Sequence, residues 1–234
     1  MSNQYFQFRK FTIFQDRCAM KVGTDGTLLG AWARGGKRIL DIGTGTGLVA
    51  LMMAQRFPEA SVLGVDIDAD ACMQASQNAE ASPYANRVSI ECCDVRYLCL
   101  HERIFFDSIV SNPPYFQDSL KNPDLRRSKV RHTDTLSYDD LFRVVSGFLS
   151  EDGEFSLIIP FDCRENLIIS AMHYGFFKSR VCAVQTTRKK QPRRYLMAFR
   201  KHIVESVEES VGVIEDAPNI RSEWYRNLTS DFYL

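Results

Sequence analysis

The sequence lacks the marks of a secreted, membrane-spanning or metal-binding protein. None of its apolar runs is long enough to cross a bilayer, and its first residues do not have the basic-then-apolar form of a secretory signal. Its seven cysteines are scattered and include no Cys-x-x-Cys pair, and its four histidines show no spacing typical of metal ligands. These absences predict a cytoplasmic protein with reduced thiols, no bound metal and no membrane contact.

An excess of charge of either sign is also absent, because 29 lysines and arginines balance 29 aspartates and glutamates. This balance argues against a uniformly basic nucleic-acid-binding protein. The charges are unevenly distributed, with basic runs at 126–132 and 188–194 and an acidic tail from residue 205. Each run is either a solvated loop or, if both flank one catalytic edge, a phosphate-binding surface. The candidate phosphate contacts are Arg126, Arg127, Lys129, Arg131, Arg188, Lys189, Lys190, Arg193 and Arg194.

The chain has no internal repeat or low-complexity tract, and 234 residues suit one domain with a sizeable core. Strand-like and helix-like segments alternate over residues 38–178, which is typical of an α/β fold with a parallel sheet and helices on both faces. A helix is predicted over 137–149 with Ser137 as its N-cap, and another over 164–173. The segment between Tyr115 and the first of these helices is predicted to be a mobile loop.

A glycine-rich loop follows the first strand of this alternating region. Residues 38–42 form a short apolar run, and Gly43, Gly45 and Gly47 then lead into a helix. Such a loop brings backbone close to a ligand. Its spacing differs from the dinucleotide-binding pattern, and the carboxylate of Asp41 is poorly placed to approach a pyrophosphate. The loop therefore suits a ligand with a sulfonium, an ammonium and no phosphate, such as S-adenosylmethionine.

Acids end the next two strands as well. Asp66 follows the apolar strand 61–65, about 20 residues past the glycines, where a carboxylate can accept from both hydroxyls of a ribose. Asp94 follows the strand 88–93, where it could accept from an adenine amino group. For any one of these acids the alternative is a helix N-cap or a solvated turn. With Asp41 they form a series of three on the edge where open α/β sheets bind ligands, which favours a binding site.

The tetrapeptide Asn112-Pro113-Pro114-Tyr115 follows an apolar strand and predicts a site that holds a planar NH2 group. The Asn112 side-chain oxygen and the Pro113 carbonyl offer two acceptors in one rigid turn, and two acceptors can hold both hydrogens of a planar NH2 group. Tyr115 offers a flat face on which a planar group can stack. The alternative is a plain proline turn that caps a strand.

These motifs, in this order, resemble those of class I S-adenosylmethionine-dependent methyltransferases that act on amino groups. The opening block Cys18-Ala19-Met20-Lys21-Val22-Gly23-Thr24-Asp25-Gly26, followed by Leu28-Leu29-Gly30-Ala31-Trp32, resembles bacterial tRNA (adenine-N6)-methyltransferases that modify an adenine beside the anticodon of a valine tRNA. The resemblance extends to Phe199 and leaves the acidic tail unmatched. Without it, the opening block is only a capped helix that lies against the sheet.

The resemblance implies a Rossmann-like, mostly parallel seven-stranded sheet whose last strands, 181–186 and 195–199, form a reversed C-terminal hairpin. It divides the chain into an N-terminal segment, 1–36, over the cofactor site, a methyltransferase domain, 37–200, and an acidic extension, 201–234. We expect the extension to pack on the main domain, with a short helix over 222–228. We expect a monomer.

The same resemblance assigns the site residues and the reaction, N6-methylation of the adenine 3' to the anticodon of a valine tRNA. The expected catalytic residues are Asn112, Pro113 and Tyr115. The expected contacts to S-adenosylmethionine are Lys21, Thr24, Asp25, Asp41, Gly43, Gly45, Gly47, Asp66, Asp94 and Asn112.

Other functions remain open at this point. A glutamine side chain of a protein such as a release factor presents the same planar NH2 group, and bases in ribosomal RNA or DNA do so too. A non-catalytic module that binds cofactor and docks on RNA is disfavoured by the intact tetrapeptide at Asn112. A dinucleotide oxidoreductase is disfavoured by the glycine spacing and by Asp41.

Overall fold

The computed structural model describes residues 3–18, 21–98, 104–113 and 136–233. Within these residues, nine strands form one sheet in the order β11-β10-β8-β9-β7-β6-β3-β4-β5, and β1 pairs with β2 in a separate hairpin. The strands are β1 Tyr5–Gln7, β2 Thr12–Phe14, β3 Arg38–Ile42, β4 Ser61–Asp66, β5 Val88–Cys92, β6 Phe106–Ser111, β7 Leu149–Pro160, β8 Phe177–Thr187, β9 Arg194–Arg200, β10 Glu208–Ala217 and β11 Ile220–Arg221. The helices are α1 Thr24–Trp32, α2 Leu48–Arg56, α3 Ala69–Glu80, α4 Tyr138–Phe148, α5 Arg164–His173 and α6 Glu223–Thr229.

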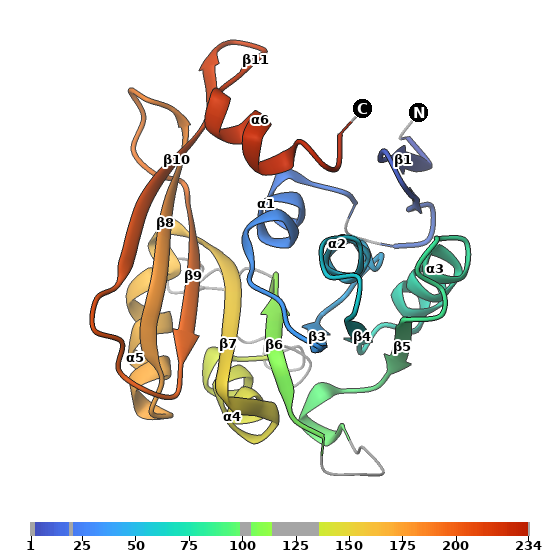
Figure 1. Cartoon of the computed structure of the whole chain (residues 1–234), viewed down its shortest axis with the longest axis horizontal. Coiled ribbons are helices and arrows are strands. Elements are labelled where there is room, and N and C mark those ends of the chain that lie inside the picture. The colour runs from blue at the N-terminus through green and yellow to red at the C-terminus, as the bar shows by residue number, and fades with distance from the viewer. Residues whose placement is uncertain (1–2, 19–20, 99–103, 114–135, 234) are drawn as a thin grey trace, which may run out of the picture.

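Helices cover both faces of the sheet (Figure 1). Strands β5, β4, β3, β6 and β7 run parallel, and β9 is antiparallel to both of its neighbours, β7 and β8. This arrangement confirms the predicted α/β fold with its reversed C-terminal hairpin. The carboxyl ends of β3, β4, β5 and β6 consequently meet at one edge.

The sheet is larger than the predicted seven strands, because the tail adds β10 and β11. Strand β10 pairs in parallel with β8, which would otherwise be an open edge. Helix α6 then turns back onto β10, where a Cβ added to Gly212 would lie 2.3 Å from the Trp224 ring. The alternating valines Val211 and Val213 fit a strand, but no local signal identifies β8 as the partner.

The alternation of aromatic and polar residues over 5–13 is typical of a single strand, but the structure divides this segment in two. Strands β1 and β2 form an antiparallel hairpin in which Phe6 pairs with Ile13. The polar pair Arg9 and Lys10 occupies the turn, and this lets the flanking phenylalanines, Phe8 and Phe11, become buried. The hairpin and the end of the tail lie side by side (Figure 1), where the Arg9 amide donates to the Phe232 carbonyl over 2.8 Å.

The helices predicted over 137–149 and 164–173 are present as α4 and α5. The Ser137 hydroxyl caps α4 by accepting from the Asp140 amide over 3.0 Å. Most of the loop predicted between Tyr115 and Ser137 lies outside the described residues.

A hydrophobic core lies on each face of the sheet. The adjacent residues Ile39 and Leu40 of β3 belong to opposite cores, as the two-residue period of a strand requires. One core is built with α1 and α2, and the other contains Phe142 of α4 with Phe155 and Phe199 from the sheet. This double burial fixes the strands whose ends form the site.

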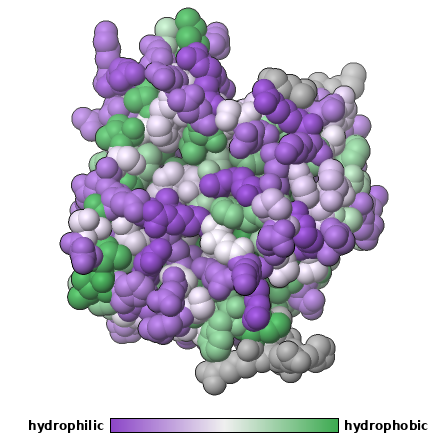
Figure 2. Space-filling model, in the orientation of Figure 1, coloured by the Kyte–Doolittle hydropathy of each residue, from purple (hydrophilic) through white to green (hydrophobic). Residues whose placement is uncertain are grey.

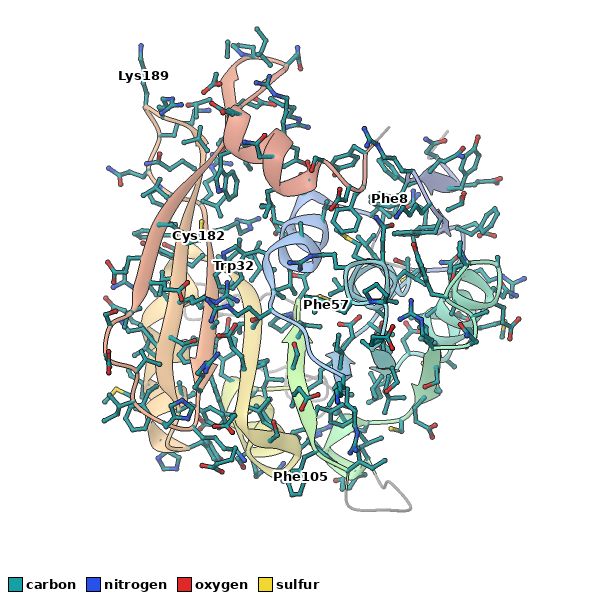
Figure 3. All side chains as sticks on the ribbon, in the orientation of Figure 1. Phe8, Trp32, Phe57, Phe105, Cys182 and Lys189 are labelled. Carbon is teal, nitrogen blue, oxygen red and sulfur yellow. The ribbon has the colours of Figure 1, made fainter. Side chains whose placement is uncertain are left out.

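A charged cluster lies at the opposite edge of the sheet. Glu154 is only 3% exposed and pairs with Arg180, with Arg200 at 3.4 Å and with Arg34 at 3.8 Å. The Arg180 guanidinium lies 3.9 Å from the ring centroid of Trp32, a side chain that Figure 3 shows between α1 and the strands. Arg34 also pairs with Glu208 of the tail at 2.7 Å. The cluster joins α1, the central strands and β10.

The face of the molecule in Figure 2 is mostly hydrophilic, with hydrophobic side chains in small separate groups. Each helix in the described part of the chain is too short or too polar to cross a bilayer.

Candidate active site

A cavity of about 600 Å³ opens at the carboxyl ends of β3, β4, β5 and β6. The first turn of α1 forms its other side. Among the predicted site residues, those that line this cavity are Lys21, Thr24, Asp25, Gly43, Gly45, Asp66, Asp94, Asn112 and Pro113. Tyr115 lies outside the described residues. The structure thus brings together motifs that are far apart in the sequence.

The glycine loop presents open backbone to the cavity. Gly43, Gly45 and Gly47 have φ values of 72°, 56° and 79°, in the left-handed region that favours glycine. Added Cβ atoms on Gly43 and Gly45 would meet nothing within 4 Å, so these positions face free space. A Cβ on Gly47 would lie 3.3 Å from the Ala75 side chain of α3. Gly47 therefore allows helix packing and is not among the residues that line the cavity, and its contact with the cofactor stays a prediction.

Asp41 also departs from its predicted cofactor contact, because it lies beneath the loop. Its side chain is 1% exposed, and Oδ2 accepts from the Thr44 hydroxyl at 2.7 Å and from the Ala50 amide at 3.1 Å. Burial raises the pKa of Asp41 to about 7, although these two hydrogen bonds oppose the shift. Asp41 thus holds the loop to the start of α2.

Asp66 faces the cavity in a fixed orientation. Its Oδ2 accepts from the Gly45 amide at 2.8 Å, and its Oδ1 accepts from the Asp68 amide at 3.1 Å. Both donors are backbone groups, and the carboxylate keeps further lone pairs for a ligand. This placement suits the predicted contact with two neighbouring hydroxyls.

Asp94 has a partner that the sequence did not reveal. Arg96 Nε lies 3.0 Å from Asp94 Oδ1 and 2.9 Å from Oδ2, and the Arg96 amide also donates to Oδ1. The hydrogen bond from Arg96 lowers the pKa of Asp94. Arg96 itself lines the cavity. A ligand here would therefore meet an oriented ion pair rather than an isolated carboxylate.

Asn112 carries the most unusual polar atom of the site. Its Oδ1 is buried and accepts no hydrogen bond within the described residues. The end of β6 is held in place, because the Ser111 hydroxyl donates to the Ile42 carbonyl at 2.9 Å. An unsatisfied buried acceptor costs about 1–3 kcal/mol, so the site is prepared for an N–H donor. The next two residues, Pro114 and Tyr115, lie outside the described residues.

The N-terminal segment is fastened to the site by polar side chains that the sequence did not mark. Asn78 of α3 is fully buried, and its amide donates to the Phe14 carbonyl and to the Thr46 carbonyl, each at 2.9 Å. Its Oδ1 accepts from the Phe14 amide, also at 2.9 Å. The hairpin is thereby tied to the glycine loop.

The second basic run divides into paired and exposed cations. Arg194 pairs with Asp25 at the cavity rim, at 2.7 Å, and Arg188 pairs with Asp216 of the tail at 3.3 Å. Lys189, Lys190 and Arg193 are exposed, and Figure 3 shows Lys189 at the tip of the turn, directed away from the body. Arg126, Arg127, Lys129 and Arg131 lie outside the described residues.

Comparisons with known proteins agree with this geometry. A family model described as the methyltransferase small domain matches residues 26–172. The tRNA1(Val) (adenine(37)-N6)-methyltransferase of Phocaeicola vulgatus is 47% identical over 100% of this chain and 99% of its own length. The protein of the same name from Parabacteroides distasonis is 46% identical with the same coverage.

Solved structures show the same fold at low sequence identity. A predicted O-methyltransferase from Agrobacterium tumefaciens has a TM-score of 0.69 at 19% identity, covering 89% of this chain and 96% of its own. TrmN from Thermus thermophilus has a TM-score of 0.53 at 24% identity, covering 75% of this chain and 47% of its own. Given the full-length identity to the curated proteins and the match to the family model, this chain belongs to the tRNA1(Val) (adenine(37)-N6)-methyltransferase family.

Proposed function

We propose that this protein transfers a methyl group from S-adenosylmethionine to the N6 atom of an adenine in tRNA, the adenine 3' to the anticodon of a valine tRNA. The names of its full-length relatives support the substrate. The observation that carries the chemistry is the buried Asn112 Oδ1 at the wall of the cavity, which accepts no hydrogen bond from the part of the chain that the structure describes.

The residues of the cavity fit S-adenosylmethionine. The open backbone at Gly43 and Gly45 lets a ligand approach closely, and Asp66 is oriented to accept from ribose hydroxyls. The Asp94–Arg96 pair would meet the adenine of the cofactor, while Asp25 and Lys21 would meet its amino-acid end. When bound, S-adenosylmethionine supplies an electrophilic methyl group.

Asn112 would activate the substrate by holding its amino group. The adenine amino nitrogen is a poor nucleophile, because its lone pair is shared with the ring. Acceptance of one amino hydrogen by Asn112 Oδ1 and of the other by the Pro113 carbonyl would raise electron density on nitrogen and favour a pyramidal geometry. These acceptors also stabilise the positive charge that grows on nitrogen in the transition state. The methylated nitrogen then loses its proton readily, so no strong general base is required.

The exposed cations of the β8–β9 turn would contact RNA phosphates. Within the described part of the second basic run, Arg188 and Arg194 form ion pairs. The other three cations are exposed, and they are Lys189, Lys190 and Arg193. An anticodon loop can deliver an unpaired base to the cavity with a smaller unstacking cost than a duplex. Residues 1–36 would cover the cofactor, and 201–234 would brace the sheet.

The test is incubation of the protein with labelled S-adenosylmethionine and either a valine tRNA transcript or a release-factor protein, followed by mass spectrometry of nucleosides and peptides. We expect N6-methyladenosine in the tRNA and an unlabelled protein. Methylated glutamine with unmodified tRNA would establish the rival reaction, since a carboxamide NH2 fits the same two acceptors.

A further inference from the structure

An exposed aromatic side chain stands at the end of β7. Phe161 is 45% exposed, although it is a large apolar residue. Its ring stacks against Tyr195 of β9, with centroids 5.7 Å apart and planes at 26°. Tyr195 is only 7% exposed, so it forms a firm base beneath Phe161.

Two arginines accompany this aromatic pair. The Arg164 guanidinium lies 5.2 Å from the Tyr195 ring centroid, and its Nη1 donates to the Tyr195 hydroxyl at 3.3 Å. The Phe161 amide donates to the carbonyl of Arg193 at 3.1 Å, which fixes Phe161 against the basic turn. The side chains of Arg164 and Arg193 are exposed. The pair is therefore held in place, with two exposed arginines in the segments that carry it.

Topology places this group at the catalytic edge. Strand β7 runs parallel to β6, with Leu157 opposite Ser111, and Phe161 therefore follows the carboxyl end of β7 as Asn112 follows that of β6. Phe161 does not line the main cavity, so it stands outside the space assigned to the cofactor. A second cavity of about 300 Å³ begins beside Tyr195 and Arg164, with Lys178 and Glu209 also on its wall.

We propose that Phe161, backed by Tyr195 and flanked by Arg164 and Arg193, is a stacking platform for a nucleotide of a single-stranded RNA loop next to the target adenine. The inference rests on the proposed function and adds the surface that holds the loop. Proteins bind single-stranded nucleic acid by combining aromatic rings on which bases stack with basic side chains that contact the backbone, and this surface supplies an exposed ring and two exposed arginines. The guanidinium groups of these arginines complement phosphates.

The test compares Phe161→Ala and Phe161→Tyr in steady-state methylation of a valine tRNA transcript. Loss of one base–aromatic stack is expected to raise the KM for tRNA about tenfold in the alanine variant. The tyrosine variant keeps a ring and should stay within about twofold of the wild type on the same reasoning. The dissociation constant for S-adenosylmethionine should not change, because Phe161 lies outside that cavity.

A matched control is Phe177→Ala. Phe177 is 39% exposed but begins β8, opposite Arg200, at the other edge of the sheet. Its replacement should leave the KM for tRNA unchanged. The salt dependence of RNA binding gives a second readout. Arg193→Gln should lower, by about one, the steepness with which the logarithm of the RNA-binding constant falls against the logarithm of the salt concentration. Phe161→Ala should leave this slope unchanged, because the ring carries no charge.

The outcomes separate the platform from the proposed function. A wild-type enzyme that methylates tRNA, with Phe161→Ala showing the same KM, overturns the platform alone. A wild-type enzyme that methylates only protein overturns the proposed function together with the platform. A higher KM for tRNA in Phe161→Ala, with a KM close to that of the wild type in Phe161→Tyr, supports both the platform and the proposed function.

Discussion

At the scale of single residues, the site contrasts satisfied acceptors with one unsatisfied acceptor. The carboxylates of Asp41, Asp66 and Asp94 all accept hydrogen bonds from the chain itself. Asn112 Oδ1 accepts none within the described residues, although it is buried. The internal hydrogen bonds therefore orient the three carboxylates, whereas Asn112 Oδ1 meets no donor among the described residues, as the proposed contact with a substrate amino group requires.

Asn112→Ala should separate chemistry from cofactor binding. It removes one of the two acceptors for the amino group, and loss of such a transition-state contact is expected to lower kcat by about 100-fold or more. The dissociation constant for S-adenosylmethionine, measured by calorimetry, should stay within about twofold, because Asn112 is one of many lining residues. An equal loss of binding and turnover would contradict the assigned role.

Asp41→Asn should change how stability depends on pH. Burial raises the folded pKa of Asp41 from 3.8 to about 7, so the unfolded chain loses this proton at lower pH than the folded chain. Ionisation thus favours unfolding, and the destabilisation grows from about pH 4 to about pH 7, reaching about 4 kcal/mol. Asparagine keeps an oxygen acceptor for Thr44 and Ala50 and does not titrate.

Urea unfolding of both proteins at pH 5 and pH 8 measures this effect. The unfolding free energy of Asp41→Asn, relative to that of the wild type, should be larger at pH 8 than at pH 5. Parallel pH profiles for the two proteins would show that Asp41 does not titrate in this range.

At the scale of elements, sequence-based prediction succeeded where the relevant residues are neighbours in the chain. The glycine loop after β3 and the position of Asn112 directly after β6 are each encoded within a few residues, and the alternation of strands and helices follows from local patterns. The Asp25–Arg194 pair joins residues 169 positions apart, and Asn78 reaches Phe14 across 64 positions, so no local pattern announces them. Strand β10 was not predicted, because it pairs with β8, whose free edge exists only once the rest of the sheet has assembled.

Gly212→Ala tests how the tail elements dock. The new Cβ would lie 2.3 Å from the Trp224 ring, so α6 must shift away from β10. Overpacking of this kind is expected to cost about 1–3 kcal/mol, measured as a lower Tm. Gly147→Ala in α4 is the control, because its Cβ would meet nothing within 4 Å.

The control should raise stability by at most about 0.5 kcal/mol, because Gly147 lies in the last turn of α4, where alanine gains less over glycine than in a helix interior. If Gly212→Ala matched this gain, the close approach of Trp224 would not govern the docking of the tail.

At the scale of the whole molecule, the Glu154 cluster connects segments that are distant in sequence. Glu154→Gln removes the anion that three arginines share and should destabilise the fold by about 3–5 kcal/mol. Glu208→Gln is the matched control. Its carboxylate is 61% exposed and pairs with Arg34 at the surface, so its loss should cost less than about 1 kcal/mol. Chemical denaturation of the two variants gives the comparison, and equal losses would show that burial of Glu154 is energetically unimportant.

The three hydrogen bonds of Asn78 have a consequence for anyone who shortens this protein. A version that lacks β1 and β2 would remove Phe14 and leave the Asn78 carboxamide with only its bond to Thr46. The defect would arise directly behind the glycine loop, far from the cut in sequence. Trimming the first two strands would therefore weaken the binding of the methyl donor even if Asn112 kept its position at the end of β6.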